Sequence, residues 1–210
     1  MTPPADSGTG VLRAGSLCTG YGGLDIAVTA VTGARLAWCA EAGRHAAAVL
    51  AHRWPGVPNL GDITALDWAQ VPPVDLVTAG WPCQDISYSG TGAGITEGTR
   101  SGLWLTIAAG LRQLQPGYVF LENVAALRTR GLGKVLGDLA ALGYDAQWAC
   151  LRASDAGACH RRDRLFILAA RPGTAGRLAA AADSGRRELQ RRGIRAVVAG
   201  PPGPAEAARP

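Results

Sequence analysis

Short apolar runs alternate with segments of helical periodicity along residues 11–170, and this alternation predicts an α/β domain. Apolar runs bounded by turn residues are typical of buried strands, whereas apolar residues three and four positions apart indicate helices. The predicted strands are residues 11–17, 35–40, 74–78, 118–121, 145–151 and 164–170, with a further strand that exits at residues 59–64. The predicted helices are residues 24–32, 43–52, 101–114 and 131–142.

Strands that alternate with helices favour a mostly parallel, twisted sheet with helices on both faces, as in Rossmann-like folds. Residues 1–10 are rich in Pro, Gly, Ser and Thr, so we expect a flexible arm there. The folded domain is expected to cover residues 11–170. Residues 171–210 are rich in Ala, Gly, Arg and Pro, so we expect a low-complexity tail that is largely disordered or weakly helical.

The net charge of +5 lies in this tail. Residues 1–170 contain 13 basic and 13 acidic side chains, whereas residues 171–210 contain 8 and 3. The overall charge therefore says little about what the folded domain binds. No apolar run reaches the length of a membrane span, and the first residues do not resemble a secretory leader, so we expect a soluble, cytoplasmic protein.

The cysteines favour neither a disulfide framework nor a zinc site. Five cysteines are an odd number, no pair has the C-x-x-C spacing, and the chain holds only 3 histidines. Free thiols are typical of a reducing compartment. A cysteine in such a chain can instead serve as a nucleophile where its surroundings lower its pKa.

Cys83 is the main candidate for such a nucleophile. It follows a predicted strand in the segment Gly80-Trp81-Pro82-Cys83-Gln84, and loops at the carboxyl ends of strands line the ligand crevice of open α/β sheets. Glu122 and Asn123 follow another strand and are expected at the same edge, where a carboxylate needs a partner, a proton or a ligand. The alternative for a lone Pro-Cys is a small apolar residue at a strand end.

Glycine and acidic residues after the first strands indicate a nucleoside cofactor. The turn Cys18-Thr19-Gly20-Tyr21-Gly22-Gly23 leads into the first helix, where free backbone N–H groups can face a ligand. Glu41 ends the second strand, 21 residues after Gly20, where Rossmann-like folds hold ribose hydroxyls. Asp62 could accept a hydrogen bond from an adenine amino group. An ordinary turn is the alternative for the glycines, and an N-cap the alternative for Asp62.

Two arginines complete the set of candidate residues. Arg162 and Arg164 flank Asp163, so on an extended segment they would share one face. They would form either a solvated edge or a pair of anion and carbonyl donors in a site.

Taken in order along the chain, these segments resemble the motifs of the DNA cytosine-5 methyltransferases. The resemblance spans about residues 11–170 and implies an S-adenosylmethionine-dependent methyltransferase fold, with duplex DNA carrying a flipped cytosine as substrate and a place in restriction-modification. It rests on six segments, namely Leu17 to Gly23, Glu41, Gly61 to Thr64, Gly80 to Gln84, Glu122 to Val124, and His160 to Arg164.

The resemblance also assigns roles to residues. Cys83 would add to C6 of cytosine and Glu122 would hydrogen-bond N3, while Arg162 and Arg164 would lie near the cysteine and the base carbonyl O2. The residues implied to hold S-adenosylmethionine are Cys18, Thr19, Gly20, Gly22, Gly23, Leu24, Glu41, Asp62, Ile63, Gly80 and Pro82. The residues implied to bind substrate are Gln84, Ser87 and Asn123, with residues 87–99 as a lid. No metal is implied.

The sequence departs from the family pattern at single positions and at its end. Cys18 stands where phenylalanine is commoner, Ala42 where an aromatic residue often stands, and His160 where glutamine is usual. The first two would mainly loosen the adenosine pocket. Beyond Ala170 neither a target recognition domain nor the C-terminal motifs of the family are recognisable.

The sequence therefore resembles the N-terminal catalytic portion of such an enzyme. One alternative is a non-catalytic or incomplete S-adenosylmethionine-binding fragment. A second is one half of a split methyltransferase, with a separate chain supplying target recognition. A third is a tRNA cytosine-5 methyltransferase built on the same motifs.

Overall fold

The computed structural model describes residues 10–82 and 102–191 of the chain. The strands are β1 (Arg13–Leu17), β2 (Arg35–Ala40), β3 (Leu76–Ala79), β4 (Tyr118–Val124), β5 (Asp145–Arg152) and β6 (Asp163–Ala170). The helices are α1 (Gly23–Thr32), α2 (Arg44–Arg53), α3 (Leu103–Leu114), α4 (Leu127–Arg130), α5 (Leu132–Ala141) and α6 (Ala175–Arg191).

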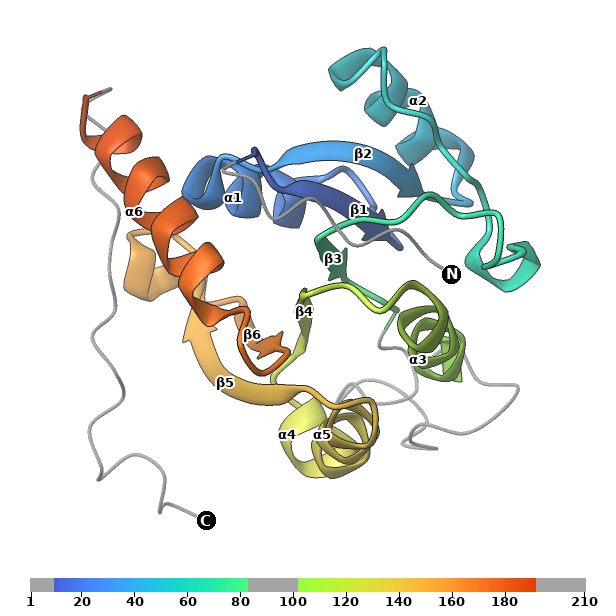
Figure 1. The fold of residues 1–210 in the computed structure, drawn as a ribbon. Coiled ribbons are helices and arrows are strands. Elements are labelled where there is room, and N and C mark those ends of the chain that lie inside the picture. The colour runs from blue at the N-terminus through green and yellow to red at the C-terminus, as the bar shows by residue number, and fades with distance from the viewer. Residues whose placement is uncertain (1–9, 83–101, 192–210) are drawn as a thin grey trace.

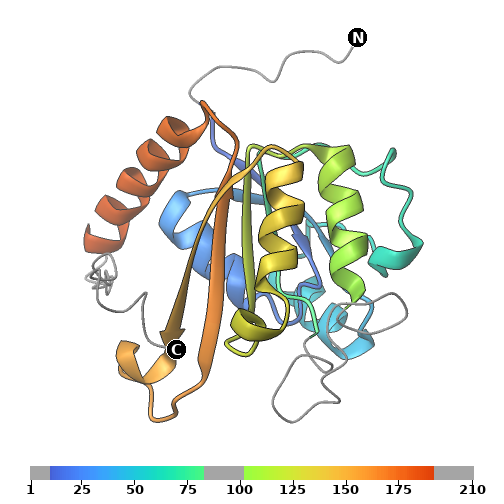
Figure 2. The ribbon, with the colours of Figure 1, turned by 90° about the horizontal axis from the view of Figure 1, so that it is seen from below.

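The strands form one sheet in the order β2-β1-β3-β4-β6-β5. The first four strands in this order pair in parallel, whereas β6 is antiparallel to both β4 and β5. Figure 1 shows the twisted sheet, and Figure 2 shows α3 and α5 side by side on one face with α1 and α6 on the other. The predicted α/β fold, with a mostly parallel sheet and helices on both faces, is confirmed.

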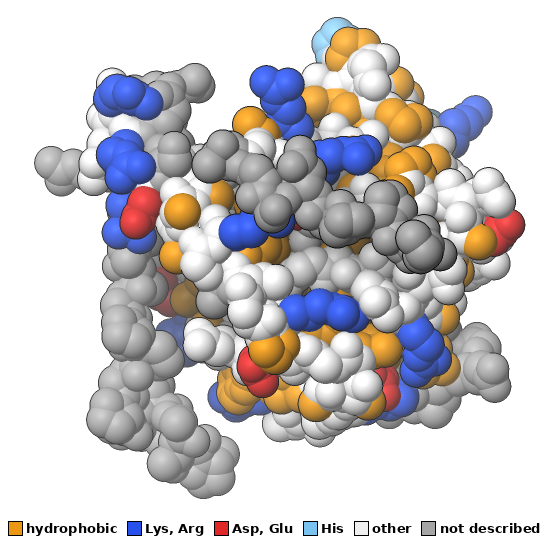
Figure 3. Space-filling view, in the orientation of Figure 1, with side chains coloured by type: hydrophobic (Ala, Val, Ile, Leu, Met, Phe, Trp, Pro, Cys, Tyr) orange, Lys and Arg blue, Asp and Glu red, His pale blue; other side chains and the backbone are white. Residues whose placement is uncertain are grey.

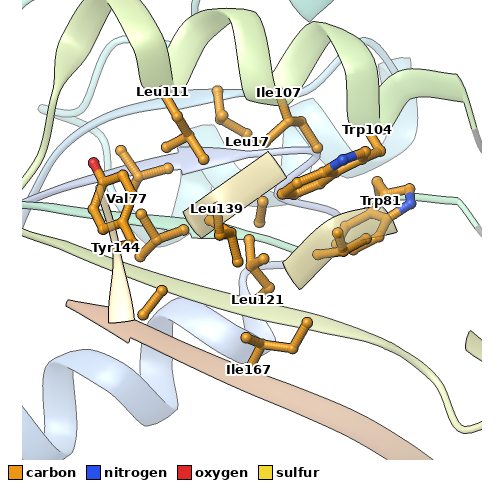
Figure 4. Close-up of a cluster of buried hydrophobic side chains, with 14 of the residues drawn as sticks. Leu17, Val77, Trp81, Trp104, Ile107, Leu111, Leu121, Leu139, Tyr144 and Ile167 are labelled. Atoms are coloured by element: carbon orange, nitrogen blue, oxygen red, sulfur yellow. The ribbon is translucent and has the colours of Figure 1, made fainter. Parts of the chain in front are cut away.

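The main core lies between the sheet and the α3–α5 layer. Figure 4 shows Trp104, Ile107 and Leu111 of α3 facing side chains of β1, β3, β4 and β6. Trp104 is fully buried, and its indole nitrogen still donates a hydrogen bond to Asp138 of α5. This bond and the apolar contacts together fix α3 on the sheet. A second, smaller cluster lies on the opposite face, between the sheet and α1.

The predicted strand that exits at residues 59–64 is wrong. Only Asn59 forms an isolated bridge, with Cys39 of β2, and the chain then turns at Gly61 with a positive φ of 81°. Residues Ile63–Ala65 form a short 3-10 turn. A strand cannot continue here because proline precedes Asn59 and a left-handed glycine follows it.

The tail was predicted to be largely disordered or weakly helical, and the structure shows the helix α6 within it. This 17-residue helix packs on α1, and its residue Gly185 is buried against the carbonyl oxygen of Val31. At its start, the Leu178 N–H donates to the Tyr118 hydroxyl at 3.1 Å. The inward residues are mostly alanines, which give little apolar periodicity, so the sequence pattern underestimates the helix. Figure 3 shows basic side chains spread over this side of the molecule, and Arg177, Arg186 and Arg187 of α6 are exposed.

The expected flexible arm and the end of the tail lie outside the described residues, and the division of the chain at residue 170 stays a prediction. Within the described ranges, none of the helices is both long and apolar enough to cross a membrane.

The contact between α6 and α1 gives a first testable prediction. A methyl group at Gly185 would overlap the Val31 carbonyl oxygen, whereas one at Gly176 of the same helix would meet no atom within 4 Å. We expect Gly185→Ala to destabilise the protein by about 1–3 kcal/mol through overpacking. The matched variant Gly176→Ala should stabilise it by about 0.5–1 kcal/mol. Denaturant unfolding measures both, and equal effects of the two variants would contradict this packing of α6.

Candidate active site

The predicted glycine-rich turn joins the end of β1 to the start of α1. Cys18, Gly20 and Gly22 all have positive φ angles of 51°, 56° and 77°. Gly22 is also the N-cap of α1, and a Cβ there would lie 2.5 Å from the ring of Trp54. Glycine at position 22 is therefore required both by its backbone angle and by the indole against it.

Glu41 joins this turn to the segment after β2. Its Oε2 accepts a hydrogen bond from the Gly20 N–H, and its Oε1 accepts one from the Gly43 N–H, both at 2.7 Å. The Asn59 side chain holds the Glu41 backbone from the other side, since its Oδ1 accepts from the Glu41 N–H at 2.9 Å and its Nδ2 donates to the Glu41 carbonyl at 3.0 Å. The carboxylate predicted to bind ribose is thus fixed at the tip of β2.

The negative charges of Glu41 and Asp62 both act on the Cys18 thiol. The pKa of Cys18 is raised to about 12, first by burial and then by the negative charges of Glu41 and Asp62. Three of the residues predicted to hold the cofactor therefore lie together, although they come from separate turns. Cys18 is a neutral thiol at physiological pH.

Asp62 also acts as an N-cap, which was the alternative role predicted for it. It caps the turn Ile63–Ala65, and its Oδ1 accepts from the Thr64 N–H at 2.9 Å and from the Thr64 hydroxyl at 2.8 Å. These bonds lower the pKa of Asp62. Ile63 is buried in the main core, so it supports the turn from within. Contacts of Asp62 and Ile63 with an adenine ring stay a prediction.

The segment that leads to Cys83 leaves β3 beside the start of α3. Trp81 is buried, and its ring lies 5.3 Å from that of Trp104, as Figure 4 shows. The Asn123 side chain is also buried and donates from Nδ2 to the Trp81 carbonyl at 3.1 Å. Asn123, predicted to bind substrate, therefore anchors the strand exit. Cys83, Gln84, Ser87 and the predicted lid lie outside the described residues.

Glu122 lies next to this exit. Residues Ala79 and Leu121 are paired in adjacent parallel strands, and a Cβ at Gly80 would lie 3.4 Å from Glu122 Oε2. The other oxygen, Oε1, forms an ion pair with Arg164 Nε at 2.8 Å. The carboxyl predicted to act with Cys83 thus lies beside Gly80, which precedes Cys83 by three residues, and it is paired with a guanidinium group.

The charge on Glu122 is balanced between two opposing effects. Burial raises the pKa of Glu122, whereas the positive charges of Arg164 and Arg162 and the Arg164 hydrogen bond lower it, and the net pKa is raised. About a quarter of each side chain in the Glu122–Arg164 pair remains exposed, at 26% and 25%. The site can therefore hold a proton on Glu122 more readily than a surface carboxyl would.

The two arginines do not occupy equivalent positions. Arg164 lies within β6, where it is paired with Val124 and lies diagonally across from Glu122. Arg162 precedes the strand, is exposed and has a positive φ of 32°. The expectation that both share one face of an extended segment is corrected, although Arg162 is near enough to lower the pKa of Glu122.

Sequence reasoning missed two residues that position the site. Asn59 orients Glu41, and Trp81 anchors the segment that leads to Cys83 in the core. Neither role has a local signal, because each depends on a partner more than 15 positions away in the chain. As for metals, no group of His, Cys, Asp and Glu suited to hold an ion occurs in residues 10–82 or 102–191.

The sequence matches the model of the C-5 cytosine-specific DNA methylase family over residues 12–195. Because this match takes in most of the chain, the protein belongs to that family. The type II methyltransferase M.NgoBI of Neisseria gonorrhoeae is 38% identical over 117 residues, which are 54% of this chain and 37% of the relative. M.HgiCII of Herpetosiphon aurantiacus is 35% identical over 159 residues, which are 72% of this chain and 36% of the relative.

Solved structures of methyltransferases share the fold. The Dnmt2 methyltransferase of S. pombe superposes with a TM-score of 0.64 and 21% identity, over 76% of this chain and 51% of that one. A DNMT2 mutant of Spodoptera frugiperda gives a TM-score of 0.61 and 21% identity, over 77% and 50%. The chain thus spans about half of these structures and about a third of the curated relatives.

The geometry of the glycine turn gives a second prediction. Gly22→Ala places a methyl group against Trp54 at a left-handed position, so we expect it to weaken S-adenosylmethionine binding by about tenfold or more. Gly137→Ala in α5 is the control, because its Cβ would meet no atom within 4 Å and it lies outside the glycine turn. Titration calorimetry measures both affinities. Equal affinities of the two variants would show that the turn does not hold the cofactor.

Proposed function

We propose that this chain supplies the catalytic portion of a cytosine-C5 DNA methyltransferase in which Cys83 is the nucleophile. The observation that carries this proposal is the position of the Glu122–Arg164 pair beside Gly80, at the strand exit that leads to Cys83. A carboxyl, a guanidinium group and the start of the cysteine segment thereby converge at the carboxyl ends of β3 and β4. Ligands of open α/β sheets bind at this edge.

S-adenosylmethionine would lie between the glycine turn and the carboxylates of Glu41 and Asp62, and it supplies an electrophilic methyl group when bound. The residues present fit such a group: Gly20 carries no side chain and a Cβ there would meet no atom within 4 Å, and the charges of the two carboxylates act on the same thiol, Cys18. Glu41 Oε1 and Oε2 each accept one backbone hydrogen bond, and a carboxylate has lone pairs for further donors such as ribose hydroxyls.

The chemistry of cytosine explains why these groups are needed together. C5 of cytosine is a weak nucleophile, and addition of the Cys83 thiolate at C6 makes it an enamine carbon that can accept a methyl group. Addition at C6 moves electron density towards N3 and O2, so a proton donor at N3 stabilises the adduct. Glu122 fits this role because its pKa is raised. Loss of the C5 proton and elimination of Cys83 then release the product.

Arg162 and Arg164 provide positive charge for the same step. Arg164 forms an ion pair with Glu122, and the positive charge of Arg162 acts on the same carboxyl. When Glu122 is protonated, the Arg164 guanidinium would be free to donate to the carbonyl O2 of the base. A cytosine inside duplex DNA cannot reach such a site, so the proposal requires the base to be flipped out of the helix.

A second candidate function is the binding of S-adenosylmethionine without turnover. The hydrogen bonds that fix Glu41 at the glycine turn support a cofactor site that does not depend on Cys83. The two candidates differ in whether residues 1–210 alone react with DNA.

Covalent trapping tests the nucleophile. We expect duplex DNA with 5-fluorocytosine to form an adduct that depends on S-adenosylmethionine, resists denaturing electrophoresis and disappears in Cys83→Ser. The control Cys150→Ser alters a cysteine of β5 and should leave the adduct unchanged. An adduct that survives Cys83→Ser would refute the mechanism. If the unaltered protein binds S-adenosylmethionine but forms no adduct, and a complementary C-terminal chain restores the adduct, the result would support the second candidate.

The pH dependence tests the proton on Glu122. Because its pKa is raised, the carboxyl carries its proton at a higher pH than usual and loses it as the pH rises through that value. We expect the ratio of the trapping rate of the unaltered protein to that of Glu122→Gln to fall with rising pH in this window. The ratio removes the pH effect on the Cys83 thiol, which both proteins share. A ratio that rises with pH would mean that the ionised carboxylate is the active form.

A further inference from the structure

A buried polar cluster lies behind the site, between α1 and the sheet. Asp25 in the first turn of α1, Ser16 of β1 and Thr78 of β3 are each only 1% exposed. A carboxyl group in such surroundings is costly unless it is paired or protonated. Arg and Lys side chains supply no ion pair to Asp25 in the described part of the chain.

The surroundings of Asp25 favour a protonated carboxyl. The Thr78 hydroxyl donates to Asp25 Oδ1 at 2.5 Å, and the Gly15 carbonyl oxygen lies 3.4 Å from the same hydroxyl oxygen. A hydroxyl has one proton to donate, so Thr78 supplies at most one hydrogen bond to the carboxyl. The other oxygen, Oδ2, is buried without a partner, as an ionised carboxylate could not be without a large cost.

The electrostatics agree with this assignment. Burial raises the pKa of Asp25, and the Thr78 and Ser16 hydroxyls and its own backbone N–H offset this only in part. The titratable group that faces Asp25 from the neighbouring strand β2 is the Cys39 thiol, whose pKa is raised first by burial and then by Asp25. β1 and β3 face it with the neutral hydroxyls of Ser16 and Thr78.

The place of Asp25 in the fold connects two loops. Asp25 follows Gly23 by two positions at the end of the glycine turn, and Thr78 precedes Gly80 by two positions at the exit towards Cys83. The bond between them joins the helix that begins at the cofactor turn to the strand that delivers the nucleophile. We propose that Asp25 is a positioning residue of the methyl transfer reaction, an uncharged acid that sets the cofactor turn and the Cys83 segment relative to each other. This role rests on the proposed function.

Substitutions of Asp25 and Thr78 distinguish the effect of their hydrogen bond from the effect of side-chain volume. Asp25→Asn keeps the shape, an oxygen that accepts from the Thr78 hydroxyl, and the absence of charge. Asp25→Leu keeps approximate volume and removes the bond, as Thr78→Val does from the other side. Thr29→Val is the control, because Thr29 lies on the same helix and its hydroxyl bonds only to the Ile26 carbonyl.

The first measurement is the free energy of unfolding of the full chain against pH, and it does not involve catalysis. A raised pKa means that the folded protein holds a proton that the unfolded chain releases at lower pH, so its stability falls as the pH rises between those two values. We expect the unaltered protein to lose stability relative to Asp25→Asn as the pH rises. If the difference in unfolding free energy between the two proteins is constant, or if the unaltered protein gains stability relative to Asp25→Asn as the pH rises, the proposal that Asp25 is uncharged would be overturned.

The second measurement is the affinity for S-adenosylmethionine together with the trapping rate on 5-fluorocytosine DNA. We expect Asp25→Leu and Thr78→Val to lose about tenfold or more in each, while Asp25→Asn stays within about threefold of the unaltered protein. Folded Asp25→Leu with unchanged affinity and trapping would overturn the positioning role. If the unaltered protein neither binds nor traps, the proposed function fails, and the stability measurement alone still decides the protonation of Asp25.

Discussion

The parallel pairing of β1, β3 and β4 is the constraint on which the site depends. Parallel strands in register end at one edge of the sheet, so the residues that follow them meet there however far apart they lie in the sequence. Leu17 is paired with Ala79, and Ala79 with Leu121. The glycines and the cysteine segment follow β1 and β3, and Glu122 follows Leu121 in the part of β4 that extends beyond the end of β3. A shift of one residue in the pairing of β3 with β4 would turn Glu122 to the opposite face of the sheet relative to β3.

The antiparallel strand β6 adds what parallel strands cannot. It runs back along β4 and so brings Arg164 from a late part of the chain beside Glu122. The pairing makes Arg164 and Glu122 diagonal neighbours, a distance that long side chains can bridge. The resulting balance between burial and positive charge sets the protonation of the carboxyl, so the topology of the sheet controls the acid chemistry of the site.

Much of the fold could be predicted because the apolar runs and glycine turns act locally. The ranges of β2, α1 and α3 agree with the pattern to within about two residues, and Gly20 and Glu41 directly follow the strands after which they were predicted. Glu122 and Asn123 were predicted to follow a strand but lie within β4, because the pairing with β6 extends β4 to Val124. The structure was needed for interactions between distant segments. Asn59 was predicted to lie in a strand, but its side chain orients Glu41. Asp25 lies in a predicted helix, and the sequence does not show that it is buried against the sheet. The helix α6 could not be read from its alanines, because it is defined by its contact with α1.

The raised pKa of Cys18 has a consequence for the selectivity of the chemistry. A sulfonium methyl donor is an alkylating agent, and any thiolate held against it would be a competing target. Burial and the two nearby carboxylates keep the Cys18 sulfur protonated, and a thiol is a far poorer nucleophile than a thiolate. In the proposed function, the carboxylates of Glu41 and Asp62 would thus protect the pocket from self-alkylation. A cysteine at position 18 would then not divert the methyl group from its target.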